Sequence, residues 1–131
     1  MISELATRER LTVRTAYNLF TQRPKHELED LESWSRMTGP GAGDDFYRMN
    51  GAGENLVQSA ADFENFMEPR TELAPTMDKE LGEVTSLLIR NRWPFQHHAT
   101  YDESIERFLN VFEEVNEKTP FSGLRWFFVH A

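Results

Sequence analysis

Two short apolar segments share one pattern, RWPFQHHA at residues 92–99 and RWFFVHA at residues 125–131. Each opens with Arg-Trp and ends in a histidine followed by alanine. The closing histidines, His98 and His130, are separated by about one strand–helix–strand unit, which takes roughly 30 residues or more. We therefore predict that both segments are strands and that both histidines are metal ligands.

The residues around these segments alternate between helix and strand patterns. Apolar side chains recur at helical spacing from Asp102 to Lys118 and again after Thr76, which can cap a helix. Pro94 lacks an N–H for strand pairing, so the first of the two strands should begin at Phe95. Further elements are predicted upstream: a strand within residues 11–20, a helix after residue 24 and a short strand at residues 46–50.

This order of elements predicts an α/β fold with parallel strands alternating with helices and right-handed crossovers. Ligands of such sheets gather at the carboxyl ends of the strands. His98 and His130 both lie at such ends. If the two strands are neighbours, about 4.8 Å apart, the imidazoles can converge on one ion.

The composition restricts the class of protein. The chain has 131 residues, 39% of them hydrophobic, which suits a single globular domain. The net charge of −8, with no stripe of Lys or Arg, argues against a nucleic-acid partner. The chain has no cysteine, so a metal would need His and carboxylate ligands, and a cytoplasmic location is expected. No apolar run approaches the ~20 residues that span a bilayer, so no membrane association is expected.

Other residues are weaker candidates for the metal site. Glu54 follows the glycine turn after a predicted strand and is either a carboxylate ligand or a solvated loop residue. Asp102 either begins a helix or orients the imidazole of His98. His97 should point to the opposite face from His98 and pack there, and His26 should be solvated on a polar helix.

Residues 51–75 are predicted to form a long loop insertion that follows the glycine turn at residues 51–53. A local helix around Ala60 to Met67 is expected. Loops of this length in compact domains often cover a substrate or bind a partner, and some are disordered. A substrate-covering role is the hypothesis.

The stretch NRWPFQHHATYDESIERFLNVFEEVNEKTPFSGLRWFFVHA (residues 91–131) closely resembles the fifth strand, fifth helix and sixth strand of metal-dependent amidohydrolases, in the branch related to N-substituted formamide deformylases. Upstream, LTVRTAYNLF and DDFYRMNGAGENLVQSAADFENFMEPR resemble the third and fourth strands with their loops. The resemblance implies a (β/α)8 TIM barrel that hydrolyses C–N bonds of amides and cyclic amides with one or two divalent metals, commonly zinc. It also implies that His98 and His130 are the metal ligands from the fifth and sixth strands.

The chain departs from the pattern of that family. It lacks the His-x-His of the first strand, the aspartate of the eighth strand, and a lysine within residues 45–50 that could bridge two metals. Residues 1–131 are thus expected to be a single partial barrel domain, an internal fragment with negligible hydrolysis of a small-molecule amide. Its open sheet edges could self-associate.

The competing hypothesis is a small acidic α/β interaction module without catalysis. It would bind a partner through the acidic, aromatic segment from Asp62 to Glu68, and its histidines would merely be packed. Metal binding distinguishes the two, because only the enzyme should lose zinc affinity in His98→Ala or His130→Ala.

Overall fold

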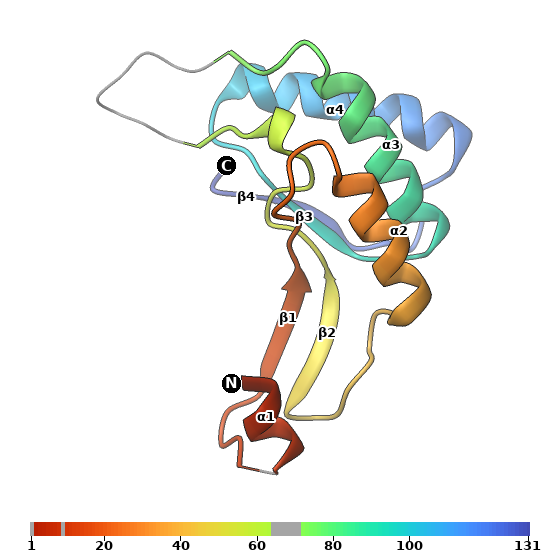
Figure 1. The fold of residues 1–131 in the computed structure, drawn as a ribbon. Helices are drawn as coiled ribbons and strands as arrows, with labels where there is room; N and C mark the ends of the chain where they lie inside the picture. Colours follow the sequence, from red (N-terminus) through yellow and green to blue (C-terminus); the bar gives the residue numbers. More distant parts are fainter. Residues whose placement is uncertain (1, 9, 64–71) are drawn as a thin grey trace.

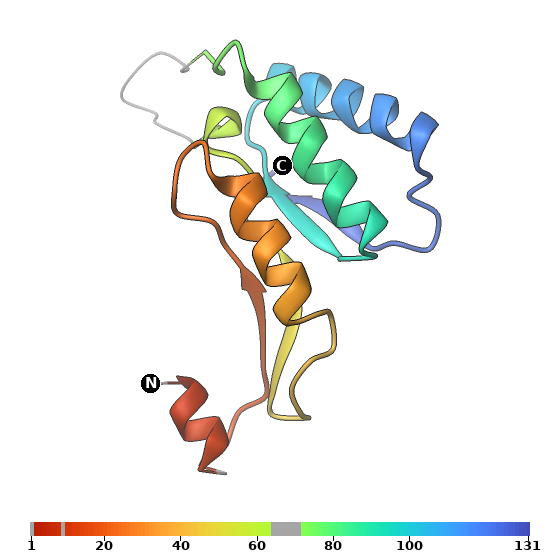
Figure 2. The ribbon, with the colours of Figure 1, turned by 45° about the vertical axis from the view of Figure 1, so that its right-hand side comes forward.

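The computed structural model describes residues 2–8, 10–63 and 72–131. Its four strands form one parallel sheet in the order β1-β2-β3-β4 (Figure 1). Helices α2, α3 and α4 pack on one face of this sheet, and α1 lies beyond the amino end of β1 (Figures 1 and 2). The strands are β1 (Thr15–Leu19), β2 (Tyr47–Ala52), β3 (Phe95–His98) and β4 (Trp126–Val129), and the helices are α1 (Ile2–Thr7), α2 (Glu27–Met37), the 3-10 helix η1 (Gln58–Ala60), α3 (Met77–Arg90) and α4 (Asp102–Lys118).

The predicted alternation of parallel strands and helices is confirmed. β3 begins at Phe95, directly after Pro94, as the missing proline N–H requires. β1 is shorter than the predicted segment and begins at Thr15. Within the described residues, β1 and β4 each pair on one side only, so the sheet is an open arc and no barrel closes.

Aromatic side chains of β3, β4 and α4 contact one another in the core and at its margin. Phe95 stacks on Trp126 with ring centroids 6.0 Å apart, and Phe112 stacks on Phe128 at 5.8 Å. Each fully buried side chain of this size contributes about 1.5–3 kcal/mol through removal of apolar surface from water. This packing fixes β3 and β4 side by side, with four residue pairs in register from Phe95↔Trp126 to His98↔Val129.

The prediction that a glycine turn ends the second strand at residue 50 was wrong. β2 runs to Ala52, which is paired with Phe95 of β3. A Cβ added at Gly51 would lie 1.9 Å from the carbonyl oxygen of Pro94. The glycine is therefore needed because two backbones approach each other closely there, which is a second common reason for glycine in a strand.

The predicted loop insertion consequently begins two residues later, and its first part is packed rather than irregular and exposed. Leu56, Val57 and Ala60 are buried in the core. Among the described residues of the insertion, η1 is the only regular element, and residues 61–63 are not helical. The rest of the predicted helix, residues 64–67, lies outside the described residues.

Candidate metal centre

Three side chains meet where β2, β3 and β4 end. The Nδ1 atom of His98 lies 2.7 Å from the Oε1 atom of Glu54, and the Nε2 atom of His130 lies 3.0 Å from the same oxygen. The two imidazole rings are 4.5 Å apart between centroids. One ligand atom from each residue falls within 4.8 Å of the others. The structure thus brings together the two histidines predicted as ligands and the glutamate that was a weaker candidate.

The backbone explains why these three side chains converge. The His98 N–H donates to the carbonyl of Glu54 at 3.0 Å, which continues the β2–β3 pairing past the end of β2. Gly53 permits this approach, since its φ is +115° and a Cβ there would lie 2.2 Å from the carbonyl oxygen of Gln96. His130 has a φ of 66°, in the left-handed region, so the chain turns directly after β4. Both irregular positions direct side chains into the cluster.

The charges in the cluster suit a cation. Hydrogen bonding with His98 is the main cause that lowers the pKa of the Glu54 carboxyl below its usual range, and the nearby imidazole charges add to this while burial opposes it. Glu54 is therefore anionic at neutral pH. A carboxylate only accepts hydrogen bonds, so the short contacts require N–H donors on the facing nitrogens of His98 and His130.

This donor set fits a divalent metal. Two imidazoles and one carboxylate form a known ligand combination for catalytic zinc, which keeps a further position open. The N–H groups at Nδ1 of His98 and Nε2 of His130 both point at Oε1 of Glu54. A metal bound by these nitrogens would displace the two protons. The side chain of His98 is 5% exposed, whereas those of Glu54 and His130 are 40% and 51% exposed. The cluster is anchored on one side and open to solvent on the other.

Residues beside the cluster hold His98 in place. The Oγ1 atom of Thr100 lies 3.2 Å from the Nε2 atom of His98. The ring of Phe63 meets the His98 ring edge-on, with centroids 4.8 Å apart. The buried carboxylate of Asp62 accepts hydrogen bonds from the backbone N–H groups of Thr100 at 2.8 Å and Tyr101 at 3.1 Å. The loop after β3 is therefore tied to the segment that follows β2.

Two further buried groups hold the segment around Glu54. The Glu27 carboxylate of α2 accepts a hydrogen bond from the Gln58 N–H at 2.9 Å. The Nδ1 atom of His97 accepts one from the Leu56 N–H at 3.5 Å. These roles of Asp62, Glu27 and Thr100 were not predicted from the sequence. Only their polarity within apolar surroundings could have drawn attention to them.

The other candidate residues lie outside the cluster. Asp102 is the exposed first residue of α4, and the ring nitrogens of His98 face Glu54 and Thr100. His97 is fully buried against Phe108 on the helix-covered side of β3, as predicted. His26 is 56% exposed at the start of α2, where its ring pairs with Glu29.

The segment assigned to partner binding by the competing hypothesis begins with Asp62, which is buried and hydrogen-bonded within the chain. Residues 64–68 of that segment lie outside the described residues. The one acidic residue in the described part of that segment is therefore not available to a partner.

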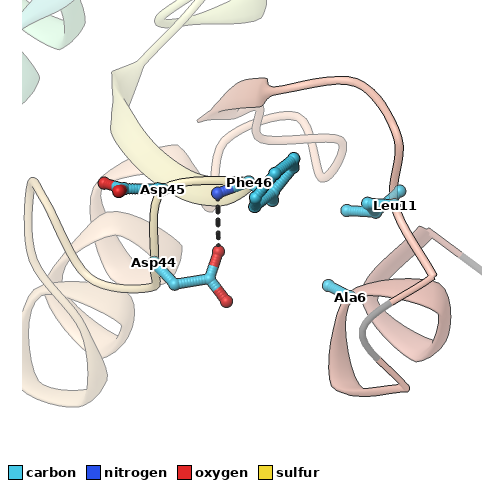
Figure 3. A pocket seen from close by; sticks show the side chains of 5 residues that line it. All are labelled: Ala6, Leu11, Asp44, Asp45 and Phe46. Atoms are coloured by element: carbon cyan, nitrogen blue, oxygen red, sulfur yellow. Dashed lines mark hydrogen bonds between the residues drawn. The ribbon is translucent and has the colours of Figure 1, made fainter.

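A separate hollow of about 620 Å³ lies at the amino end of the sheet (Figure 3). It is lined by Ala6, Leu11, Asp44, Asp45 and Phe46. The Asp44 carboxylate accepts hydrogen bonds from the backbone N–H groups of Phe46 and Tyr47, which also lowers the pKa of Asp44. This acid stabilises the turn into β2, and the hollow lies away from the carboxyl ends where the three-residue cluster forms.

None of the helices in the described ranges is both long and apolar enough to traverse a lipid bilayer.

Comparison with known proteins gives the family. No curated protein and no solved structure matches the chain. A family model described as the amidohydrolase family matches residues 1–131. Proteins of this family are TIM-barrel hydrolases that generally use divalent metals. Because the match spans the whole sequence, the chain belongs to the amidohydrolase family.

Proposed function

We propose that the chain carries the metal-binding part of an enzyme that hydrolyses C–N bonds of non-peptide amides or cyclic amides, as in the branch related to N-substituted formamide deformylases. The substrate is a small-molecule amide. Glu54, His98 and His130 hold the metal, which is zinc. The observation that supports this proposal is the convergence of their three donor atoms within 4.8 Å at the carboxyl edge of the sheet.

Each of the three residues has a distinct task. Glu54 supplies a full negative charge because its pKa is lowered. His98, nearly buried, supplies a fixed nitrogen, and the Thr100 hydroxyl beside its second ring nitrogen can accept the N–H of the tautomer that metal binding requires. His130 completes the set from the exposed side. When bound, a divalent metal supplies Lewis-acid polarisation of a carbonyl and lowers the pKa of water toward neutrality.

Zinc affinity of the purified 131-residue chain tests the proposal. It would be measured by competition with a chromophoric chelator. We expect one site per chain, and a loss of affinity of about 100-fold or more in His98→Ala and in His130→Ala, because each change removes a ligand rather than a supporting group. His130 is half exposed, so its replacement should leave folding intact even if that of His98 does not.

His26→Ala is the matched control, since His26 is an exposed histidine that pairs with a glutamate elsewhere on the chain. It should bind zinc as the unmodified chain does. Equal zinc affinity in His130→Ala and His26→Ala would contradict the proposed site.

A further inference from the structure

The sheet has two free edges, and neither is protected. Among the described residues β1 pairs only with β2, and β4 only with β3, so each directs a row of backbone N–H and C=O groups away from the sheet. Proteins usually protect such edges with charged side chains or proline. Thr15–Leu19 and Trp126–Val129 contain neither. The two edges are therefore open to pairing with another strand.

The register of the four strands shows how strongly the sheet is staggered. Leu19 is aligned with Ala52, and Ala52 with Phe95. Phe95 is aligned in turn with Trp126. This line across the sheet starts at the last residue of β1 and ends at the first residue of β4. Figure 1 shows the resulting coil, because β1 and β2 run steeply in that view and β3 and β4 run across it.

This stagger is the one that half of an eight-stranded barrel needs. In a (β/α)8 barrel, a line drawn across the strands returns to its first strand displaced by eight residues. Two identical halves would each supply four of the eight. Four residues before Leu19 is Thr15, the first residue of β1. Two copies would therefore close a barrel if Trp126 of one were aligned with Thr15 of the other.

The backbone of β1 presents the groups that this register requires. The Thr15 N–H and the Leu19 carbonyl bond toward β2, so Ala16 and Asn18 direct their backbone groups to the free edge. A new parallel neighbour of β1 must bond to these two residues.

The backbone of β4 matches them. The carbonyls of Arg125 and Val129 bond toward β3, so Phe128 directs its backbone groups to the free edge. In a parallel pair, such a residue bonds to the two residues that flank its partner. With Phe128 opposite Tyr17 of a second copy, the flanking residues are Ala16 and Asn18. A shift of one residue would instead present groups that already bond toward β2.

The side chains at the junction also fit. Trp126 and Phe128 contact Phe112 of α4, so Phe127 points to the face that the helices of the described ranges leave uncovered. Phe127 is 52% exposed there. Its neighbour in this register is Ala16 of the second copy, which is small and exposed. A large side chain beside a small one suits a barrel interior, which side chains fill.

We infer that two copies of this chain join edge to edge, with β4 of each paired to β1 of the other, and form a closed eight-stranded parallel barrel. The twofold closure leaves no free edge, so assembly stops at two copies. The inference concerns the sheet edges and is independent of the proposed metal centre.

Sedimentation of the purified chain over a range of concentrations tests this inference. We expect a reversible equilibrium between the 15.3 kDa chain and its dimer, without larger species. Phe127→Glu would place a charge in the barrel interior and should raise the dissociation constant by about 100-fold or more. Phe127 is half exposed in the single chain, so the variant should still fold. Met37→Glu, at the exposed end of α2, is the matched control and should dimerise normally.

Two exposed arginines test the register. Arg14 and Arg125 directly precede β1 and β4, so Arg125 of one copy would lie beside Arg14 of the other. Like charges in such a position oppose pairing. Arg14→Glu and Arg125→Glu should each tighten the dimer by about threefold or more at physiological salt, and combining them should cancel the gain. Pairing of β4 with β4 would leave Arg14→Glu without effect.

Four results would overturn the inference. The chain could stay monomeric throughout the concentration range, or form open-ended larger assemblies. The dimer could also persist unchanged in Phe127→Glu, or fail to tighten in Arg14→Glu.

Discussion

His97 and His98 are neighbours on β3, yet they lie in two regions with opposite chemistry. The His97 region is the aromatic core under α4, where its ring meets Phe108 edge-on at 4.6 Å. The His98 region is the carboxyl edge of the sheet, where its ring meets the Glu54 carboxylate. Both side chains are almost completely buried. The difference shows that burial alone does not determine the chemistry of a histidine, because the group that each ring faces differs.

The pKa values follow this contrast. Burial, with a smaller contribution from the neighbouring His98 charge, lowers the pKa of His97 from 6.5 to about 3, so this ring is neutral at any physiological pH. At the edge, hydrogen bonding with His98 lowers the pKa of Glu54. One region therefore excludes charge, and the other retains it.

The largest effect should come from Gly53→Ala. This change would push apart the backbone that follows β2 and the backbone of β3, whose close contact forms the edge region. The new Cβ would lie 2.2 Å from a backbone oxygen of β3 at a φ of +115°. Overpacking and backbone strain together should cost about 2–6 kcal/mol of unfolding free energy. Zinc affinity should fall with it, because Glu54 is the next residue.

Urea denaturation would measure this loss, with Gly39→Ala as the matched control. A Cβ at Gly39 meets nothing within 4 Å. Similar midpoints for the two variants would mean that the β2 and β3 backbones are not held as closely as the structure has them.

The second effect comes from the core region and depends on pH. Because the folded-state pKa of His97 lies below the unfolded value, the unfolded chain binds the proton more readily between pH 6.5 and about 3. The stability contribution of neutral His97 is therefore complete above that window and is lost as the pH falls through it. By about pH 5 the loss should reach about 2 kcal/mol.

His97→Leu should flatten the dependence of unfolding free energy on pH from about 7 to 5, as measured by urea denaturation at each pH. The lowered pKa of Glu54 affects stability only at lower pH, below the usual range of that carboxyl, so the two contributions separate. His26→Leu, at an exposed site, should keep the slope. If the unfolding free energy of His97→Leu depends on pH as that of the unmodified chain does, the loss of stability in acid comes from another group.

The sequence was sufficient to predict the core region, because its signals are local. Apolar spacing along residues 102–118 gave α4, and Pro94 gave the start of β3. Parallel order then placed His98 and His130 at the same edge of the sheet, where the structure brings their rings together.

The edge region was less predictable, because its contacts join residues far apart in the chain. The glycines at residues 51 and 53 were interpreted as a turn. In the structure, glycine is needed at both positions because β2 and the residue that follows it lie against the backbone before and within β3. Asp62 accepts hydrogen bonds from backbone N–H groups 38 and 39 residues away. Nearly every residue has such a group, so the sequence does not indicate which one Asp62 binds. Such anchors become visible only when the two loops are placed together.

A third prediction concerns Asp62, which ties the two loops of the edge region. Asp62→Ala would leave two backbone N–H groups without their acceptor and should lower the unfolding free energy by about 1–3 kcal/mol. Asp62→Asn should cost less, because an amide oxygen can still accept. Thermal unfolding would measure both, with the exposed Asp45→Ala as control. Equal stability of Asp62→Ala and Asp45→Ala would show that the loops are held without this anchor.

The smallest effect should come from Thr100, which touches His98 but contributes no ligand. In a neutral, metal-free ring with its proton on Nδ1, that N–H of His98 donates to Glu54 and Nε2 accepts from the Thr100 hydroxyl. A metal held at Nδ1 would leave the proton on Nε2, which would then donate to the same oxygen. A hydroxyl serves both states, because it can donate and accept.

Thr100→Val keeps the shape and removes that oxygen, so zinc affinity should fall by about tenfold at nearly unchanged stability. Thr100→Ser should restore most of the affinity. Chelator competition on the two variants measures the difference, and equal affinities would mean that the hydroxyl does not stabilise the tautomer of His98 that binds metal. In that case the core packing of β3 alone would orient the ring, and the two regions would be less independent than their chemistry suggests.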